Sequence, residues 1–542
     1  MDVGTISIVL VLGLIILLAI GMPLGLASAV LALLVMIMKF EPTLLTDPMS
    51  FGEGLLTGRP GTGPLYILTQ KIFDLLTEYV LISVPLFIFM ASLLERSGVA
   101  KTMYDSLNFW LSSVRGGIAI VTSLMAVLLA AMSGIIGGEV VLLGLIALPQ
   151  MLRLGYNQNL AIGTICASGS LGTMIPPSIV LIIYGLITET SIKALFTGAF
   201  IPGFMLASFI IIYIVVRTQM NPALAPLPEK KEGDAAGSYK LVMFTGFLSI
   251  VVGCLATILF VRALLYTVTG ANADLPEQQG PVFLGMTYHL PWLGGIAAAC
   301  GVLYQFVIGK QKCIDGWHHG KGLVPPVTII GIVLGSIYGG VTGITEAAGM
   351  GALAVFVFAL LRGEASIGML WDSLMRTLRS TGTIIWVTVG AAALSGAYTL
   401  AGGPSYIAQL IVGADMPAFL VILTMMLILL FMGAFMDWVG IVLLIIPVFL
   451  PIVRALPIEE IGLFGQLAPH HVAVWFGVLF CMNMQVSFLS PPFGPAAFYL
   501  KSVAPPHISL TDIFRGFLPF IGVQLLALTV LLVWPSIVAL LL

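Results

Sequence analysis

The sequence predicts an all-α membrane protein with many spans, made of two related halves. Hydrophobic residues are 59% of the 542 residues and charged residues only 8%, whereas soluble domains carry about 25% charged residues. Mean hydropathy is +1.12, and apolar runs long enough to cross a bilayer recur along the whole chain. Two copies of one polar pattern interrupt these runs, which indicates an internal duplication.

The repeated pattern combines an acid, a single proline, a Pro-Pro dipeptide and a tyrosine. In both copies the acid precedes the proline by ten positions, and the Pro-Pro ends seven positions before the tyrosine. The members are Glu139, Pro149, Pro177 and Tyr184 in the first copy, and Asp437, Pro447, Pro492 and Tyr499 in the second. Between the single proline and the Pro-Pro, the second copy holds 17 additional residues, which correspond to a polar connection.

A Pro-Pro inside an apolar run removes two backbone donors and breaks the helix. Such breaks are tolerated at membrane depth where the freed carbonyls line a cavity, and a matched pair in two halves indicates the ion and substrate site of a transporter. A proline kink that serves only packing is the alternative. Recurrence of the Pro-Pro together with an intramembrane acid favours the site.

The first half covers residues 1 to 217. Its residues 5 to 38 are too long for one span, because 34 residues would reach about 50 Å across a hydrocarbon core of about 30 Å. We therefore expect a break between Gly21 and Gly25. The N-terminus lacks the basic region and cleavage site of a signal peptide and is read as a retained membrane helix. A mixed loop over residues 40 to 76 is expected to contain an interfacial helix.

Small residues interrupt the apolar run just before the first acid. They are Ser133-Gly134 and Gly137-Gly138, followed directly by Glu139. We predict that the chain turns back here as a re-entrant hairpin, because the interruption stands beside an intramembrane acid. Tight helix packing through small residues is the alternative.

Residues 218 to 323 read as an insertion with cytoplasmic loops and two additional spans, at 241 to 266 and 291 to 308. The loop between these spans contains no Lys or Arg, whereas both flanks carry several lysines. By the positive-inside rule both flanks are cytoplasmic. The second half, residues 324 to 542, therefore keeps its orientation. In that half we expect another helix break near Ser395-Gly396.

Several ordered motifs resemble the large membrane subunit, of DctM type, of tripartite ATP-independent periplasmic (TRAP) transporters. The resemblance covers nearly the whole chain except about residues 218 to 322. The motifs are Val84-Pro85-Leu86-Phe87, Gly155-Tyr156, Ile175-Pro176-Pro177-Ser178, Gly339-Gly340 with Thr345-Glu346-Ala347-Ala348, Met436-Asp437, and Ser490-Pro491-Pro492 with Gly494.

The resemblance implies an elevator-type secondary transporter of the bacterial inner membrane, with inverted repeats and two re-entrant hairpins. It implies two protein partners, a small four-helix membrane subunit and a periplasmic binding protein, and sodium-coupled uptake of an organic acid without any other cofactor. The residues implied for sodium are Ser133, Gly172, Ile175 and Pro177. The duplication predicts a second sodium site at Gly433, Ser487, Ser490 and Pro492.

Two departures from the family pattern concern the site and the partners. The family's usual acid is Asp in a Ser/Ala-rich context, whereas this chain has Gly137-Gly138-Glu139. This difference leaves the local substrate contacts open. The insertion with two additional spans is also atypical and bears on how the small subunit docks.

Intramembrane acids are costly, about 2.5 kcal/mol or more for Asp at a helix centre, so idle roles are not expected. Glu139 and Asp437 either support the site, ligate a cation or carry a proton, and support is favoured. Glu346 has the same ambiguity. No Arg or Lys lies mid-span in the repeated stretches, so half-helix N-termini and hydroxyls are expected to hold a carboxylate. The candidate hydroxyls are those of Ser168, Ser170, Ser380 and Thr381.

Other classes of function fit the sequence less well. It has no HExxH, no GxSxG and no phosphate-binding glycine loop followed by Lys, so an enzyme is not expected. It has no basic patch for nucleic acid. A channel would repeat its filter around a symmetric pore, which a single internal duplication does not provide. A stand-alone sodium- or proton-coupled organic anion symporter of similar architecture remains the alternative.

Overall fold

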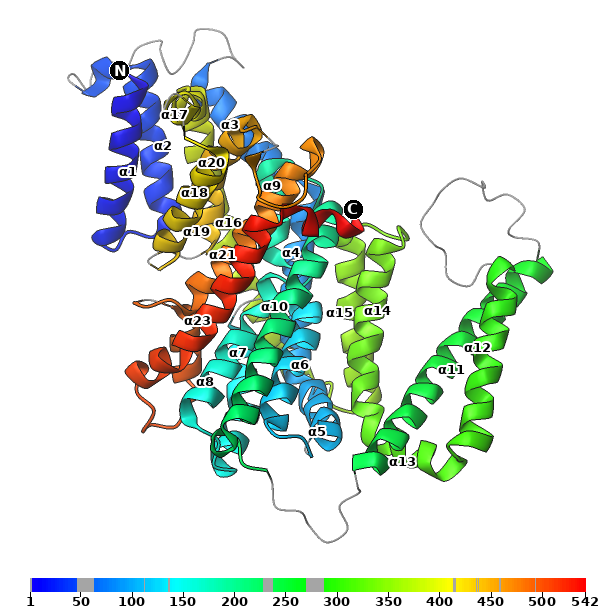
Figure 1. Cartoon of the computed structure of the whole chain (residues 1–542). Coiled ribbons are helices and arrows are strands. Elements are labelled where there is room, and N and C mark those ends of the chain that lie inside the picture. The colour runs from blue at the N-terminus through cyan, green and yellow to red at the C-terminus, as the bar shows by residue number, and fades with distance from the viewer. Residues whose placement is uncertain are drawn as a thin grey trace.

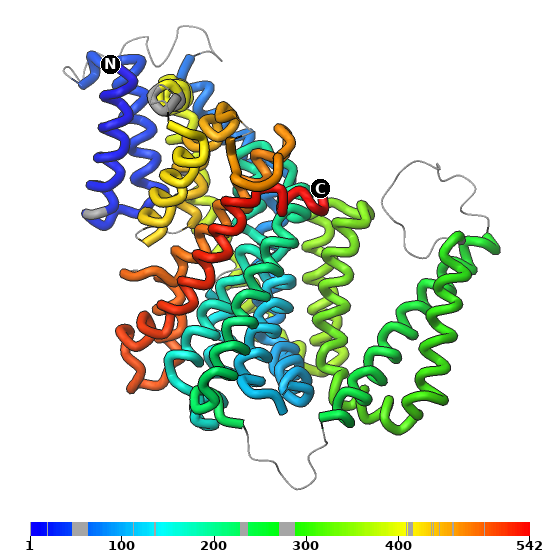
Figure 2. The backbone as a smooth tube through the Cα atoms, in the orientation of Figure 1, coloured from blue at the N-terminus to red at the C-terminus, as the bar shows by residue number. Residues whose placement is uncertain are grey.

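The computed structural model describes residues 2–45, 63–111, 113–134, 137–227, 237–269, 287–412, 416–434, 436, 438–457, 460–492 and 494–542. Throughout these ranges the regular structure is helical (Figures 1 and 2). By length and composition, nine of the described helices are apolar and long enough to cross a membrane. The predicted all-α polytopic fold is therefore confirmed.

The first half begins with two packed helices separated by a turn. Gly21 adopts a φ of 84° and Pro23 caps the second helix, so the expected break between Gly21 and Gly25 is confirmed. The helices of this half are α1 (Val3–Ala19), α2 (Leu24–Phe40), α3 (Pro64–Thr77), α4 (Ser83–Arg96), α5 (Val99–Leu111), α6 (Gly117–Ser133), α7 (Gly138–Arg153), α8 (Gln158–Gly169), α9 (Ile179–Thr188) and α10 (Ile192–Met220).

Helices α6 and α7 form the first predicted hairpin. Gly116, just before α6, packs against Thr218 near the end of α10, and Asn157, just after α7, donates its backbone N–H to the Leu224 carbonyl at 2.9 Å. Both open ends of the hairpin therefore lie at the same end of α10, the lower end in Figure 1. Gly134, at the end of α6, lies in the interior against the break between α8 and α9.

The second half repeats this arrangement upside down. Its hairpin spans Ala418 to Ala455. The two ends of this hairpin lie side by side, because the Ala418 N–H bonds to Glu460 at 3.4 Å, and the hairpin opens toward the upper end in Figure 1. The helices are α17 (Gly403–Val412), α18 (Ala418–Gly433), α19 (Trp438–Leu444), α20 (Ile446–Ala455), α21 (Val472–Leu489), α22 (Pro495–Lys501) and α23 (Leu510–Val533). The break between α21 and α22 matches the break between α8 and α9.

A frame of longer helices flanks the hairpins. It contains α14 (Val324–Tyr338), α15 (Ile344–Leu361) and α16 (Ile367–Leu400), with α15 packed on α4 and α16 packed on α2, α3 and α4. The break expected near Ser395-Gly396 is wrong, since α16 continues through it. Gly396 instead allows close packing, because an added Cβ would lie 3.1 Å from Leu68 of α3.

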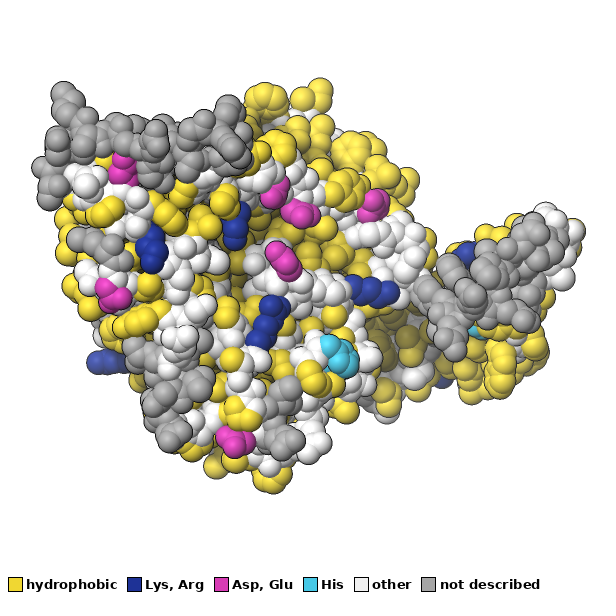
Figure 3. All heavy atoms as spheres, turned by 90° about the horizontal axis from the view of Figure 1, so that it is seen from above, with side chains coloured by type: hydrophobic (Ala, Val, Ile, Leu, Met, Phe, Trp, Pro, Cys, Tyr) yellow, Lys and Arg dark blue, Asp and Glu magenta, His cyan; other side chains and the backbone are white. Residues whose placement is uncertain are grey.

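The inserted segment forms an arm beside the body. Helix α11 (Gly237–Thr269) pairs with α12 (Leu290–Val302), and α13 (Lys310–Gly320) connects the pair to the frame. Only 17% of the best span window in α11 is buried, and the arm projects from the body in all three views (Figures 1–3). Seen from above, charged side chains are scattered among hydrophobic and neutral ones (Figure 3).

The contact between α2 and α16 is close enough to be tested with one methyl group. A Cβ added at Gly390 would collide with the Gly25 carbonyl oxygen, whereas a Cβ at Gly382 of the same helix meets nothing within 4 Å. We expect Gly390→Ala to destabilise the protein by about 1–3 kcal/mol and Gly382→Ala to change stability by less than about 0.5 kcal/mol. Thermal unfolding of the purified chain measures both, and equal melting temperatures would contradict the close packing.

Candidate functional site

A cavity of about 430 Å³ lies where both hairpins, both breaks and α16 meet. Gly134 comes from the first hairpin tip and Trp438 from the second, while Ile179 and Pro495 each begin the helix that follows a Pro-Pro. The described lining residues are Leu24, Ile88, Gly134, Ile179, Val180, Ser380, Thr383, Ile384, Val387, Trp438, Val439, Phe488, Pro495 and Tyr499. Residues beside both hairpin tips and both Pro-Pro breaks, far apart in the sequence, thus converge on one space, and of the repeated residues themselves Tyr499 is in the described lining.

The first hairpin tip touches the first broken helix through backbone atoms. Gly134 has a φ of 60°, and its carbonyl accepts a hydrogen bond from the Ile179 N–H at 3.3 Å. An added Cβ would collide with the Pro177 carbonyl oxygen. Only glycine therefore allows this contact, because the left-handed conformation and the approach both exclude a side chain.

The Glu139 carboxyl group connects this tip to the break. It is 3% exposed, and Oε1 accepts a hydrogen bond from the Ser133 hydroxyl. A Cβ added at Gly172 would lie 2.7 Å from Oε1, so the carboxyl packs directly on the backbone of the break. The other oxygen, Oε2, is buried without a hydrogen-bond partner, although buried polar atoms are normally paired.

The first break is held by side chains of its own sequence. Residues Leu171–Thr173 form one 3₁₀ turn after α8, and the Pro176-Pro177 bond is cis. Ser178 donates to the Thr173 carbonyl at 2.6 Å and caps α9 by accepting from the Leu181 N–H. Ile175 is 1% exposed and packs near Gly203 of α10. Its side chain is therefore used in packing, and only its backbone is available to a site at the break.

The second copy has corresponding contacts. Gly433, at the end of α18, packs against the Ser487 side chain so closely that a Cβ would collide with it. The Ser490 hydroxyl donates to the Val486 carbonyl at 2.8 Å, and the Pro491-Pro492 bond is cis. Asp437 lies outside the described residues.

Of the four hydroxyls predicted to hold substrate, only that of Ser380 lines the cavity. Ser168 pairs with Ser123 at 2.8 Å, and Ser170 donates to the Ala167 carbonyl and accepts from Gln524 at 3.2 Å. Both are therefore occupied inside the protein. Thr381 is absent from the described lining and its hydroxyl is buried without a partner.

Glu346 also lies apart from this cavity. It stands in the first turn of α15, is exposed, and accepts a hydrogen bond from the Tyr79 hydroxyl at 2.8 Å. Its neighbour Thr345 donates to the Tyr79 carbonyl at 3.4 Å. The acid thus joins α15 to the start of α4.

The sequence reasoning missed three buried amides. Gln485 donates to the Thr173 hydroxyl and so connects α21 to the first break, while Asn483 donates to the Met426 carbonyl at 2.8 Å. Together with Gln524, each keeps a buried carbonyl oxygen without a partner. An amide inside an apolar run is the signal that could have identified them, because such residues need partners in lipid.

A second omission is the ion pair between Arg376 of α16 and Glu95 of α4. The Glu95 carboxylate also lies against Gly138, at the start of α7, where an added Cβ would collide with it. A further pair, Arg96 with Asp372 at 2.9 Å, connects the same two helices. Arg376 lies on α16 and Arg96 at the end of α4, outside the repeated stretches in which Arg and Lys were sought.

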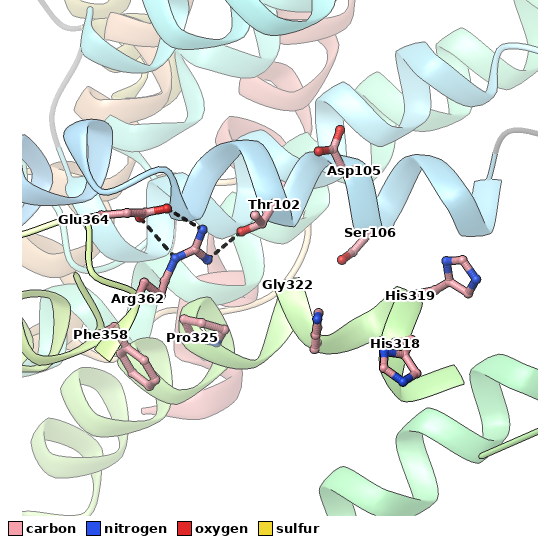
Figure 4. Close-up of a pocket in the computed structure, with 11 residues that line it drawn as sticks. Thr102, Asp105, Ser106, His318, His319, Gly322, Pro325, Phe358, Arg362 and Glu364 are labelled. Carbon is pink, nitrogen blue, oxygen red and sulfur yellow. Dashed lines mark hydrogen bonds and ion pairs between the residues drawn. The ribbon is translucent and has the colours of Figure 1, made fainter. Parts of the chain in front are cut away.

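A larger cavity of about 640 Å³ lies between α5, α13 and the loop after α15 (Figure 4). None of the repeated motifs lines it in the described part of the chain. Arg362 there binds Glu364 at 2.9 Å and Thr102 at 3.0 Å, and His318 and His319 lie on the other side (Figure 4). Its described lining shares no residue with the cavity between the hairpins, so the two cavities are distinct.

The family profile described as tripartite ATP-independent periplasmic transporter, DctM component, matches residues 11–537. The chain belongs to this family. Relatives include the C4-dicarboxylate TRAP transporter large permease protein DctM of Pseudomonas aeruginosa, with 24% identity over 87% of this chain and 88% of the relative. Members of the family are transporter permeases, so the expectation that the chain is not an enzyme is confirmed.

Other relatives carry different substrates in their names. The 2,3-diketo-L-gulonate TRAP transporter large permease protein YiaN of Escherichia coli is 23% identical over 88% of this chain and 89% of its own length. The ectoine/5-hydroxyectoine permease protein UehC of Ruegeria pomeroyi is 26% identical over 84% of this chain and 83% of its own length. Among solved structures, the Alcanivorax borkumensis YdaH transporter matches with a TM-score of 0.54 at 15% identity, over 94% of this chain and 97% of that chain, which indicates a shared fold.

The contact at the first hairpin tip yields a prediction with a matched control. Gly134 and Gly21 both have positive φ, so alanine costs about 1–2 kcal/mol at either position. Only at Gly134 does the new methyl group also meet a carbonyl oxygen, since Gly21 has nothing within 4 Å. We expect Gly134→Ala to lower stability by about a further 1–3 kcal/mol. Thermal unfolding compares the two variants, and an equal loss of stability would show that the hairpin tip is not in close contact with the Pro177 carbonyl.

Proposed function

We propose that this permease carries a small organic anion across the bacterial inner membrane together with sodium. The observation that supports the proposal is the convergence of both hairpin tips and both Pro-Pro breaks on one cavity. Paired discontinuous helices of this kind expose backbone carbonyls and helix ends to ions and substrates at the bilayer midplane. Movement of the hairpins against the frame would expose the cavity to each side in turn.

The first sodium site is proposed at Ser133, Gly172, Ile175 and Pro177. Sodium is a hard cation that prefers oxygen ligands, as calcium and magnesium do. The Ser133 hydroxyl, the carbonyls near the break and the unpartnered Glu139 Oε2 supply such oxygens within one buried region. A cation there would also compensate the buried carboxylate, which is costly without a partner.

The second sodium site is proposed at Gly433, Ser487, Ser490 and Pro492. It rests on the matching break, on Ser487, whose side chain packs against Gly433 at the hairpin tip, and on Ser490, whose hydroxyl lies at the end of α21. Two sites related by the duplication would couple two ions to each transport step. This part of the proposal rests on the symmetry of the two copies.

Family membership supports the proposed partners. A large TRAP permease works with a small membrane subunit and a periplasmic binding protein, and we propose that the latter delivers the substrate to this chain. The named substrates of the relatives include C4-dicarboxylates and 2,3-diketo-L-gulonate, which supports an organic acid. A stand-alone symporter would need no binding protein, so uptake without that protein distinguishes the two.

Uptake into proteoliposomes tests the coupling. The permease, its small subunit and its binding protein are reconstituted, and accumulation of labelled organic acids is followed with an inward sodium gradient or with choline in its place. We expect accumulation only with the sodium gradient. Full accumulation in choline would contradict sodium coupling.

Ser133→Ala and Ser490→Ala test the proposed ligands. Each removes one oxygen, so we expect the sodium concentration for half-maximal uptake to rise roughly tenfold, equivalent to about 1.4 kcal/mol. Ser249→Ala is the matched control for Ser490→Ala, because its hydroxyl likewise donates to a carbonyl one turn earlier, at 2.8 Å, but lies on α11. An unchanged sodium response in both test variants would show that these serines are not ligands.

A further inference from the structure

The walls of the cavity between the hairpins are apolar. Trp438 comes from the second hairpin, and Phe488 and Tyr499 flank the second break with their rings 6.2 Å apart in a stacked arrangement. Aliphatic side chains of α2, α4, α9 and α16 complete the walls, and Ser380 and Thr383 add hydroxyls. None of the described lining residues is Lys, Arg, His, Asp or Glu.

Charge is placed at one edge of this cavity. Arg376 precedes Ser380 by one helical turn on the same face of α16, and Glu95 follows the lining residue Ile88 by two turns on the same face of α4. Glu95 also lies against Gly138, next to Gly137, which packs on the ring of the lining residue Tyr499, so the ion pair lies beside the end of the cavity toward the start of α16. That end is expected to face the cytoplasm, because Arg362, just before α16, contacts Thr102 of α5. Thr102 in turn packs on Gly322, which follows the lysine-bearing flank that the positive-inside rule places in the cytoplasm.

The Glu95 carboxylate at this edge has two favourable neighbours. One is the Arg376 guanidinium, whose side chain is 42% exposed, and the other is the N-terminal turn of α7 at Gly138. A guanidinium and the positive end of a helix are both suited to a carboxylate. A protein carboxylate thus occupies the position in which a substrate carboxylate would find the same partners.

We propose that the cavity binds a monocarboxylate with an aliphatic or aromatic body, and that its carboxylate takes the place of Glu95 at Arg376 while Glu95 keeps its contact with the N-terminal turn of α7. The inference rests on the proposed function and names its substrate class. The body of the anion lies against Trp438, Phe488 and Tyr499. A volume of about 430 Å³ falls within the range of about 300–1,000 Å³ usual for small-molecule pockets, so a branched or ring-bearing acid fits.

A small dicarboxylate fits these walls poorly. Its first carboxylate would take the Arg376 position, but its second would lie against aromatic and aliphatic side chains without a counter-charge among the described lining residues. An unpaired buried charge is strongly disfavoured. The single charged edge therefore selects against a second negative charge.

Binding to the purified permease tests the substrate class without the selectivity of the binding protein. The full chain with its small subunit is heated in the presence of phenylpyruvate, 4-methyl-2-oxopentanoate, pyruvate, succinate or fumarate, with sodium present. A ligand that binds the folded state raises the melting temperature. We expect phenylpyruvate and 4-methyl-2-oxopentanoate to stabilise more than pyruvate, and succinate and fumarate least. Stronger stabilisation by succinate would overturn this substrate class. Sodium-driven uptake of succinate would in that case still support the proposed function.

Variants of the ion pair test the role of Arg376 with opposite expected signs. Arg376→Gln removes the anchor, so the apparent Kd for phenylpyruvate should rise at least tenfold. Glu95→Gln removes the competing carboxylate, so the Kd should fall severalfold. Asp372→Asn, which breaks the neighbouring pair with Arg96, is the control and should leave the Kd unchanged.

A charge exchange separates anion binding from a merely structural ion pair. The double variant Glu95→Arg with Arg376→Glu keeps a pair between α4 and α16 but moves the cation to the other helix. We expect its melting temperature without ligand to recover toward that of the wild type, while phenylpyruvate binding stays weak. Recovery of binding together with stability, or a parallel loss in Glu95→Gln and Arg376→Gln, would overturn the proposed anchor.

Discussion

Inside a bilayer every backbone polar group must be satisfied by the protein, and this constraint governs the centre of the molecule. Two Pro-Pro dipeptides remove donors and interrupt helices where lipid offers no replacement. Each hairpin tip therefore lies against a break: Gly134 bonds to Ile179 beside Pro177, and Gly433 packs on Ser487 just before Pro491. The interrupted helices are themselves enclosed by protein, since α21 is buried along its whole length and α8 and α9 along most of theirs, so the polar groups freed at the breaks are kept away from lipid.

The order of elements and the position of the breaks could be predicted from the sequence. Proline and glycine act through their own backbone, so Pro177, Pro492 and Gly134 reveal a break or a turn without knowledge of their neighbours. The duplication then places the two breaks in equivalent positions. The same local logic failed near Ser395, because a small residue within a helix serves either a break or close packing, and only the partner helix α3 decides between them.

Side-chain partners could not be predicted in the same way. Ser168 and Ser170 look like ligands in the sequence, but they are satisfied by Ser123 and Gln524, which are distant in the chain. Arg376 was overlooked because its position near the cavity depends on how α16 crosses the hairpins. Such contacts depend on the packing of separate helices, so no local pattern in the chain encodes them.

The seam between α2 and α16 has a mechanical consequence. Where Gly390 meets the Gly25 carbonyl, main chain rests on main chain without interposed side chains, and two helices held in this way have no flexible layer along which to shear. The two helices therefore form one rigid unit. Gly390 follows Thr383 by two turns on the same face of α16, so this close contact lies in line with the wall that α16 contributes to the cavity and fixes that wall to α2.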